Sequence, residues 1–138
     1  MKVIDAKNQI LGRFCSNIAT TLTKSRDKII IVNARYVIIS GNKNDIFEKY
    51  DERAERKSKG NPQRNPKYPR YPDAIVKKTI RRMLPKGPKG DEAIKRLKVY
   101  IDVPEEYKKE ISESPNFSKE IKGITLEELS KHLGANLK

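Results

Sequence analysis

A short run of aliphatic residues constrains the fold of this chain more than any other feature of its sequence. Residues 28–33 read Lys-Ile-Ile-Ile-Val-Asn, so four consecutive side chains are apolar and polar residues flank them. A strand with one wet face alternates apolar and polar residues, whereas a continuously apolar strand is typical of a central strand covered on both faces. The run therefore predicts a layered α/β domain with a largely parallel sheet.

Helical and strand patterns alternate on both sides of this run. A short strand is expected at residues 2–6, and apolar residues then recur at spacings of three and four over residues 10–24, as on one face of a helix. Such alternation favours parallel strands joined by helices. The later expected elements are a strand or hairpin-like extension at 36–41, helices at 43–57 and 72–84, a short helix at 91–97 and a strand at 98–103.

The 138 residues predict a single α/β domain with two less regular regions. Residues 57–72 contain four prolines and almost no aliphatic side chain, so we expect an extended basic loop. Residues 104–138 are acidic overall, and we expect the part up to residue 123 to be irregular. A C-terminal helix should follow, capped by Thr125 and Glu128 and ended by Gly134.

Charge is distributed unevenly along the chain, which carries 31 Lys and Arg, 18 Asp and Glu, and a formal net charge of +13. Residues 56–89 hold twelve bases and a single acid, Asp73, whereas residues 99–138 carry a net charge of −2. A surplus of this size repels itself in a compact domain unless a polyanion neutralises it. Its clustering favours nucleic acid as partner, then an anionic membrane surface, over a solvated surface without a partner.

The helix expected at 72–84 separates charge from apolar surface most clearly. Its apolar side comprises Ile75, Val76, Ile80, Met83 and Leu84. Its opposite side comprises Lys77, Lys78, Arg81 and Arg82. At 100° per residue the two sets barely overlap, so we expect this helix to dock on the core and to present its four bases outward.

Several classes of protein are disfavoured by what the sequence lacks. No apolar run approaches the roughly 18 residues that span a bilayer, and the N-terminal residues carry no apolar segment of the kind found in signal peptides. The single cysteine, Cys15, lies on an apolar helical stripe and cannot form an internal disulfide. We therefore expect a buried thiol in an intracellular protein.

Catalytic chemistry finds little support in the sequence. There is no Walker-type motif, and the glycine–lysine turns at 41–43 and 86–90 can hold a phosphate but are equally typical of ordinary turns. His132, the only histidine, falls in the last turn of the C-terminal helix, where a capping or dipole role is favoured over metal binding. We expect no enzyme activity, metal, cofactor or small-molecule substrate.

The basic loop favours RNA over DNA as the polyanion. An extended proline-rich arm suits an irregular folded surface better than a regular groove, and no common DNA-binding motif is present. Tyr68 and Tyr71 alternate with Lys67 and Arg70 in this loop. Their rings either stack on unpaired bases or pack against the prolines of the loop, and the sequence leaves both possibilities open.

A set of short motifs over residues 3–100 resembles the universal large-subunit ribosomal protein family thirteen. The motifs occur in the order of the family, and they are Val3–Ala6, Ile10–Arg13, Ile31–Ala34, Ile39–Lys43, Ile80–Pro85 and Arg96–Tyr100. The loop from Asn65 to Asp73 resembles the archaeal and eukaryotic branch, because the bacterial branch has a segment with His and Gly there. Residues 104–138 carry less of the shared pattern.

The resemblance implies a three-layer α/β/α domain with a mainly parallel four-stranded sheet. It also implies a structural constituent of the large ribosomal subunit that binds and stabilises ribosomal RNA, without catalysis, beside neighbouring ribosomal proteins in the cytoplasm. The alternatives are a free-standing RNA-binding regulator and, as a weaker one, a nucleotide-using enzyme.

Candidate RNA-binding residues follow from charge and periodicity, not from the resemblance. Arg13, Asn42 and Lys43 are included because they open helices, where anions bind readily. The full set is Arg13, Asn42, Lys43, Arg56, Lys57, Lys59, Arg64, Lys67, Tyr68, Arg70, Tyr71, Lys77, Lys78, Arg81, Arg82, Lys86 and Lys89.

Overall fold

A four-stranded parallel sheet forms the centre of the molecule in the computed structural model, which describes residues 1–112 and 121–137. The strand order is β4-β2-β1-β5, and every neighbouring pair runs parallel. The strands are β1 (Lys2–Asp5), β2 (Ile29–Val32), β4 (Leu97–Val99) and β5 (Ile111–Ser112). All four residues of β2 are buried between its two neighbours. The predicted α/β class and mainly parallel sheet are confirmed.

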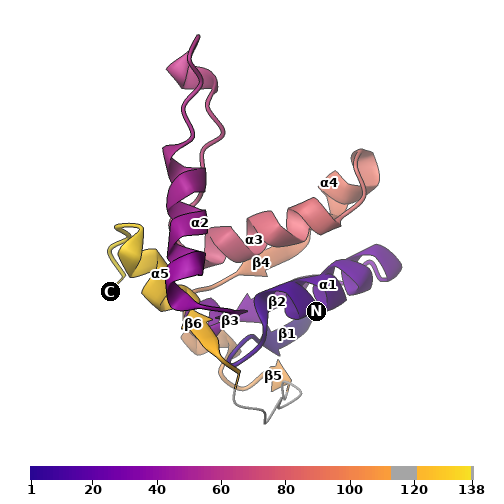
Figure 1. The fold of residues 1–138 in the computed structure, drawn as a ribbon. Helices are drawn as coiled ribbons and strands as arrows, with labels where there is room; N and C mark the ends of the chain where they lie inside the picture. The colour runs from indigo at the N-terminus through magenta and orange to yellow at the C-terminus, as the bar shows by residue number, and fades with distance from the viewer. Residues whose placement is uncertain (113–120, 138) are drawn as a thin grey trace.

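The two faces of the sheet are covered differently. Ile29 and Ile31 belong to the main core, which also includes buried residues of helices α1 (Leu11–Lys24) and α3 (Pro72–Met83). Figure 1 shows these helices together with α4 (Pro88–Lys95) along the same side of the sheet. Ile30 and Val32 face a smaller cluster with Tyr100, Val103, Tyr107 and Ile111. The layer on that face is irregular chain around the 3₁₀ helix η3 (Glu105–Tyr107).

The strand expected at residues 36–41 is shorter than predicted and lies outside the main sheet. After the 3₁₀ helix η1 (Ala34–Tyr36), β3 (Ile38–Ser40) pairs antiparallel with β6 (Gly123–Thr125). A Cβ atom at Gly123 would lie 2.2 Å from the carbonyl oxygen of Ile39, so this pairing requires glycine. The expectation that residues 104–123 are irregular is wrong in part, because β5, the start of β6 and η3 all fall within them. Residues 113–120 lie outside the described part of the chain.

The C-terminal helix α5 (Leu126–His132) begins and ends as its sequence predicts. The Thr125 hydroxyl oxygen accepts a hydrogen bond of 3.3 Å from the backbone N–H of Glu128. Gly134 adopts a φ of 86°, and the next N–H, of Ala135, bonds back to the carbonyl of Ser130 at 2.9 Å. This arrangement is the left-handed helix end that glycine favours.

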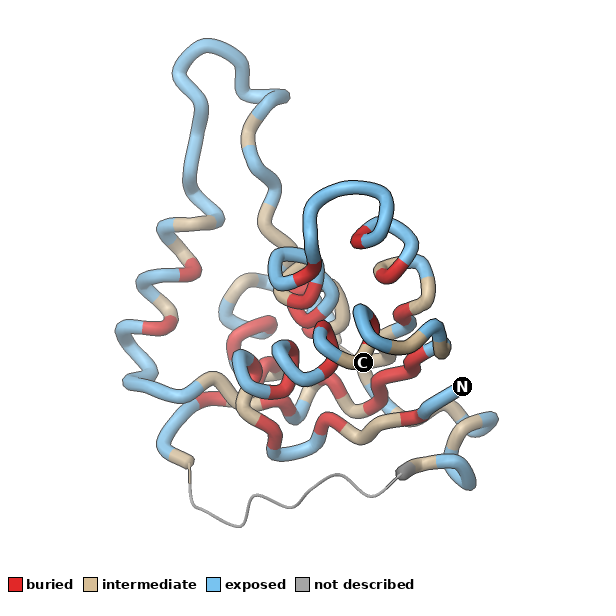
Figure 2. The backbone as a smooth tube through the Cα atoms, turned by 90° about the vertical axis from the view of Figure 1, so that its right-hand side faces the viewer, coloured by how far each residue is buried: buried red, intermediate tan, exposed pale blue. Residues whose placement is uncertain are grey.

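Helix α2 (Lys43–Glu55) and the segment that follows it project away from the sheet. We call residues 56–71 the arm. In Figures 1 and 2 the arm extends beyond the end of α2, turns and returns to the start of α3, and it is exposed along most of its length. The 3₁₀ helix η2 (Pro62–Arg64) is its one regular element, and Asn61 caps it by accepting a 3.0 Å hydrogen bond from the N–H of Gln63. This agrees with the extended loop predicted at 57–72.

Several local predictions are wrong. Met83, expected on the buried side of α3, is 45% exposed, because the helix ends at this residue and the chain turns so that Leu84 enters the core instead. Helix α4 begins at Pro88, three residues earlier than expected, because Gly87 with a φ of 107° precedes it. Strand β4 begins at Leu97 and ends at Val99, so it is shorter than predicted.

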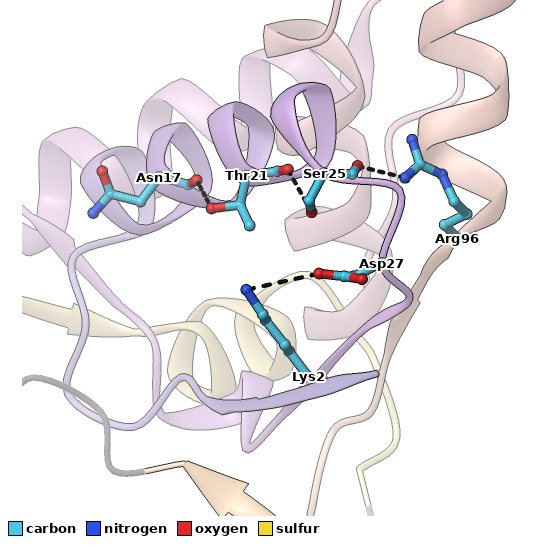
Figure 3. Close-up of polar contacts among 6 residues, drawn as sticks. All are labelled: Lys2, Asn17, Thr21, Ser25, Asp27 and Arg96. Atoms are coloured by element: carbon cyan, nitrogen blue, oxygen red, sulfur yellow. Dashed lines mark hydrogen bonds and ion pairs between the residues drawn. The ribbon is translucent and has the colours of Figure 1, made fainter.

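The C-terminus of α1 is capped by Arg96, a side chain from 71 positions further along the sequence than Ser25. Figure 3 shows Arg96 beside this helix end, where its guanidinium donates hydrogen bonds of 2.6 Å to the carbonyl of Ser25 and 3.0 Å to that of Leu22. A cation stabilises a helix C-terminus because the last carbonyls carry partial negative charge. Lys2 and Asp27 form an ion pair of 3.7 Å nearby (Figure 3). Arg96 therefore has a structural role, as the cap of this helix end.

Cys15 lies in the interior of this layer. The thiol is completely buried against the main core, as its place on the apolar stripe predicts. Burial raises the pKa of Cys15 to about 12, because a thiolate would lose its hydration there. The residue is a core side chain and not a reactive one.

Candidate nucleic-acid interface

The base of the arm is anchored by Tyr68. This ring packs partly buried against the main core and meets Tyr50 of α2 edge-to-face, with centroids 5.7 Å apart and planes at 80°. Arg53, also on α2, donates a hydrogen bond of 3.1 Å to the Tyr68 hydroxyl oxygen. Aromatic pairs of this geometry add roughly 0.5–1.5 kcal/mol beyond the area they bury. Tyr68 thus joins the arm to α2 from a position 15 residues away in sequence.

Three cations surround the Tyr68 ring. The Lys78 ammonium lies 4.2 Å from the ring centroid, and the guanidinium carbons of Arg53 and Arg82 lie at 5.6 and 5.9 Å. The Lys78 ammonium also donates a hydrogen bond of 2.9 Å to the carbonyl of Lys67, which ties the arm to α3. A ring face attracts cations through its quadrupole, and this attraction offsets part of their mutual repulsion.

Burial lowers the pKa of Lys78, and repulsion by Arg82 and Arg53 adds to that shift. The side chain is half-buried, whereas Lys77, Arg81 and Arg82 are exposed. The prediction that all four bases of α3 point outward is therefore wrong for Lys78, which turns toward the arm. The buried side of α3 is as predicted at Ile75, Val76 and Ile80.

A basic groove runs between the end of the arm, α3 and α4. Its volume is about 900 Å³, and we define the groove by its lining residues, Lys67, Tyr68, Pro69, Ala74, Lys77, Lys78, Arg81, Arg82, Ile94 and Lys95. Six of these are Lys or Arg, and the lining includes no carboxylate. The groove brings together five of the predicted bases and Tyr68, all within residues 67–82, and α4 adds Lys95.

Groove geometry depends on the turn between α3 and α4. A Cβ atom at Gly90 would lie 2.0 Å from the carbonyl oxygen of Pro85, so only glycine lets α4 fold back this closely. Lys86 and Lys89 are exposed in this turn, and Lys89 lines a second cleft of about 850 Å³ beside the end of α1. Lys95 lines both hollows, so basic surface continues around α4.

Comparison with known proteins assigns this chain to a family. The family model described as ribosomal protein L13 matches residues 1–106. The large ribosomal subunit protein uL13 of Methanocaldococcus jannaschii is 50% identical over 139 residues, covering 98% of each chain. This chain belongs to the ribosomal protein L13 family. The uL13 proteins of Methanococcus maripaludis (45% identical, 98% of each chain) and Saccharolobus solfataricus (42%, 96% of this chain and 91% of the relative) agree.

The resemblance drawn from the motifs is thereby confirmed, and the relatives reported above are all archaeal, in line with the sequence of the arm. The L13 family model ends at residue 106, close to the point where the motifs become sparse. The alignments with the uL13 relatives nevertheless cover 98% of this chain and so include the C-terminal region that contains β6 and α5.

Some predicted residues of this L13-family chain are already paired with carboxylates. Ion pairs join Lys43 to Glu128 at 3.7 Å, Arg56 to Glu52 at 3.8 Å and Arg81 to Asp91 at 3.8 Å. The Asn42 amide contacts Asp45 at 3.4 Å. Arg13 is exposed in the first turn of α1, and among the described residues neither it nor Asn42 or Lys43 lines the groove.

Other predicted residues lie on the arm outside the groove. Tyr71 is 44% exposed immediately before α3, so its ring is far more open than that of Tyr68. The remaining arm bases, all exposed, are Lys57, Lys59, Arg64 and Arg70. The arm therefore carries four further exposed cations outside the groove.

Sequence reasoning missed Arg53 and Lys95. Arg53 is not among the candidate residues, yet it fixes Tyr68, and no local signal in α2 reveals a contact 15 residues away. Lys95 lines the groove because α4 folds back on α3, and no charge pattern in α4 singles it out, since Asp91 and Glu92 balance its two lysines. His132 does not cap its own helix: it bonds Asp51 at 2.8 Å and stacks on Phe47 with centroids 4.1 Å apart.

Neither a metal centre nor a membrane span is formed by the described residues. Within residues 1–112 and 121–137 no group of three or more His, Cys, Asp or Glu side chains is placed to hold a metal ion. None of the helices in the described part of the chain is long and apolar enough to span a bilayer.

Proposed function

We propose that this chain is a structural constituent of the large ribosomal subunit and that it binds and stabilises folded ribosomal RNA through the groove and the arm. The observation that carries the proposal is the groove itself, where six cations from the arm, α3 and α4 converge without a carboxylate among the lining residues. Membership of the ribosomal protein L13 family supports the choice of ribosomal RNA as the polyanion.

Electrostatics explains how this surface acts. Each Lys or Arg that neutralises a phosphate releases a condensed counterion, so affinity is high and falls steeply with salt. Arginine also grips phosphate with two parallel N–H groups. Because the arm is exposed and extends away from the sheet (Figure 2), it can enter a crevice between RNA segments while the groove holds the adjacent backbone.

A structural role in the ribosome also implies the partners, the location and the absence of catalysis. Neighbouring ribosomal proteins are expected partners, the cytoplasmic ribosome is the expected location, and no substrate, cofactor or catalysis is involved. Hydrolysis of ATP or GTP by the pure protein, abolished by Lys43→Ala, would instead support a nucleotide-using enzyme. We expect no hydrolysis above background, since Lys43 is paired with Glu128 and lies outside the groove.

Sedimentation of cell lysate tests the function. A tagged copy should travel with the large subunit in a sucrose gradient at physiological salt and leave it only at high salt. A protein that stayed at the top of the gradient, while large subunits sedimented normally, would rule the proposal out and favour a free-standing RNA-binding regulator. Selective binding to one isolated oligonucleotide at physiological salt would strengthen that alternative.

A further inference from the structure

The groove has a chemical feature that phosphate binding alone does not use. Four of its ten lining residues, Tyr68, Pro69, Ala74 and Ile94, present apolar surface among the six cations. The outside of a regular RNA helix offers phosphates and sugars, so a duplex laid across the groove would contact the cations and leave the apolar residues facing water. Apolar surface is costly to leave exposed, and in a concave site it is typical of ligand binding.

An unpaired nucleotide carries both kinds of complementary surface. Its base has two apolar faces, and its flanking phosphates are anionic. A groove of about 900 Å³ falls within the range of sites that hold small organic groups, so a base can enter it. An extruded base needs surface that covers its faces, and the groove lining offers Pro69, Ala74 and Ile94, because the Tyr68 ring is already covered by Lys78, Arg53 and Arg82.

We infer that the groove binds a single unpaired nucleotide extruded from the RNA, with the base against Pro69, Ala74 and Ile94 and its phosphates on Lys78 and Arg82. The inference rests on the proposed function, because it names the part of the RNA that this site takes. The arm would then position the RNA, and the groove would select a bulge or an open junction over a continuous duplex.

Two of the cations beside Tyr68, Lys78 and Arg82, are available to bind such a phosphate. Lys78 and Arg82 form no ion pair with a carboxylate among the described residues, in contrast to Arg81, which pairs with Asp91 at 3.8 Å. Repulsion between Lys78, Arg82 and Arg53 contributes to the lowered pKa of Lys78. A phosphate placed there relieves this repulsion, so its binding is favoured at the point where the Tyr68 contacts already hold the three cations.

Two RNA hairpins of the same sequence test the inference, one with a single bulged 2-aminopurine in its stem and one without the bulge. The native protein should bind the bulged hairpin about tenfold more tightly, which is the contribution of one stacked base. The 2-aminopurine fluorescence should change on binding, since the base moves from water into the groove.

Two matched tryptophan variants locate the effect. Ala74→Trp fills the groove without changing any charge, and it should abolish the preference for the bulge, so that the variant binds the two hairpins with equal affinity. Ala54→Trp makes the same change at an exposed position of α2 outside the groove and should keep the preference. Should Ala74→Trp fail to fold, Ile94→Ser tests the same surface, and the comparison of the two hairpins by the native protein stands without either variant.

These experiments can contradict the binding of an unpaired nucleotide without contradicting RNA binding by this protein. Equal affinity for both hairpins, or a bulge preference that survives Ala74→Trp, overturns the inference while RNA binding stands. Displacement of the bulged RNA by an acidic tyrosine-containing peptide, with no such displacement from the Ala74→Trp variant, would assign the groove to a protein partner and also overturn it. Failure to bind either hairpin and failure to sediment with the large subunit would remove the proposed function itself.

Discussion

Two sides of this molecule both carry cations but use them differently. Between α2 and α5, polar side chains meet carboxylates: Lys43 pairs with Glu128 at 3.7 Å, and the His132 ring forms a hydrogen bond of 2.8 Å with Asp51. Along the groove, by contrast, the lining contains six Lys or Arg and no carboxylate. Arg81 alone of these six forms an ion pair with a described residue, at 3.8 Å.

The charged side chains between α2 and α5 are neutralised within the protein, whereas most of the groove cations have no carboxylate partner among the described residues and are available to an anionic ligand. An exposed ion pair stabilises a fold by about 0–1 kcal/mol, so the contacts between α2 and α5 contribute little to the free energy of folding. The cations of the groove repel one another, and apart from the contacts of Lys78 and Arg82 with the arm this repulsion opposes folding. They remain in place because the buried side of α3 is anchored by Ile75, Val76 and Ile80, all 0–1% exposed. The groove is therefore a surface whose electrostatic partner lies outside the chain.

The largest effect is expected where the groove meets the core. Ile80→Asp buries an unpaired carboxylate at a side chain with no exposure and should destabilise the fold by about 4–5 kcal/mol, enough to unfold it. Thermal melting followed by circular dichroism measures this. Arg82→Asp, two residues further along α3 but exposed, should melt close to the native protein. A folded Ile80→Asp protein would contradict the account of how α3 docks.

The next largest effect is expected on RNA binding, where the groove cations can be compared with the cations that pair with carboxylates. Replacement of Lys77, Lys78, Arg81 and Arg82 by Gln should weaken RNA binding about 100-fold and flatten the plot of log affinity against log salt, by about 0.9 for each phosphate that is no longer neutralised. Replacement of Lys43 and Lys131 by Gln should change affinity and slope little, because both pair with carboxylates and lie outside the groove and the arm. Equal effects from both sets would erase the distinction between the two sides. Filter binding at a series of salt concentrations measures both the affinity and its salt dependence.

A smaller effect distinguishes the two tyrosines of the arm. Tyr68→Ala removes the contacts with Tyr50 and Arg53 and should destabilise the protein by about 2–3 kcal/mol, because it opens a cavity beside the core. Tyr71→Ala, at a ring that is 44% exposed, should cost less than about 1 kcal/mol. Urea unfolding measures both, and comparable destabilisation by the two variants would show that Tyr68 does not anchor the arm.

The smallest effect concerns the protonation of Lys78. Since its folded pKa is lowered below the ordinary value of 10.5, its share of the folding free energy becomes more favourable as pH rises from the folded pKa to 10.5. A bound phosphate should raise this pKa by favouring the ammonium form. Nuclear magnetic resonance titration of the lysine side chain with and without RNA reports the shift. A pKa that falls or stays constant on RNA binding would place the phosphate elsewhere.

Local patterns predicted the parts of this structure that depend on neighbours in sequence. The apolar run of β2, the stripe of α1 and the two-sided α3 were all evident, because periodicity reports burial within one element. The binding of RNA by the candidate residues remains a prediction. Their grouping was partly visible, since most of the groove bases lie within residues 67–82.

Contacts between distant segments were not predictable in this way. The direction of Lys78 depends on the carbonyl of Lys67, and the hydrogen bond from Arg53 to Tyr68 requires the arm to return to α2. Lys95 joins the groove only because Gly90 lets α4 approach Pro85. Each of these depends on tertiary packing, which no periodicity in a single segment encodes.

The central claim is that the uncompensated cations of the groove and arm bind ribosomal RNA while the paired side does not. Ultraviolet crosslinking in intact large subunits, followed by mass spectrometry of the peptides attached to RNA, tests it most directly. We expect crosslinks from the arm, α3 and α4, with the attached RNA at a bulge or junction. Crosslinks confined to α2 and α5, with none from residues 56–95, would contradict it.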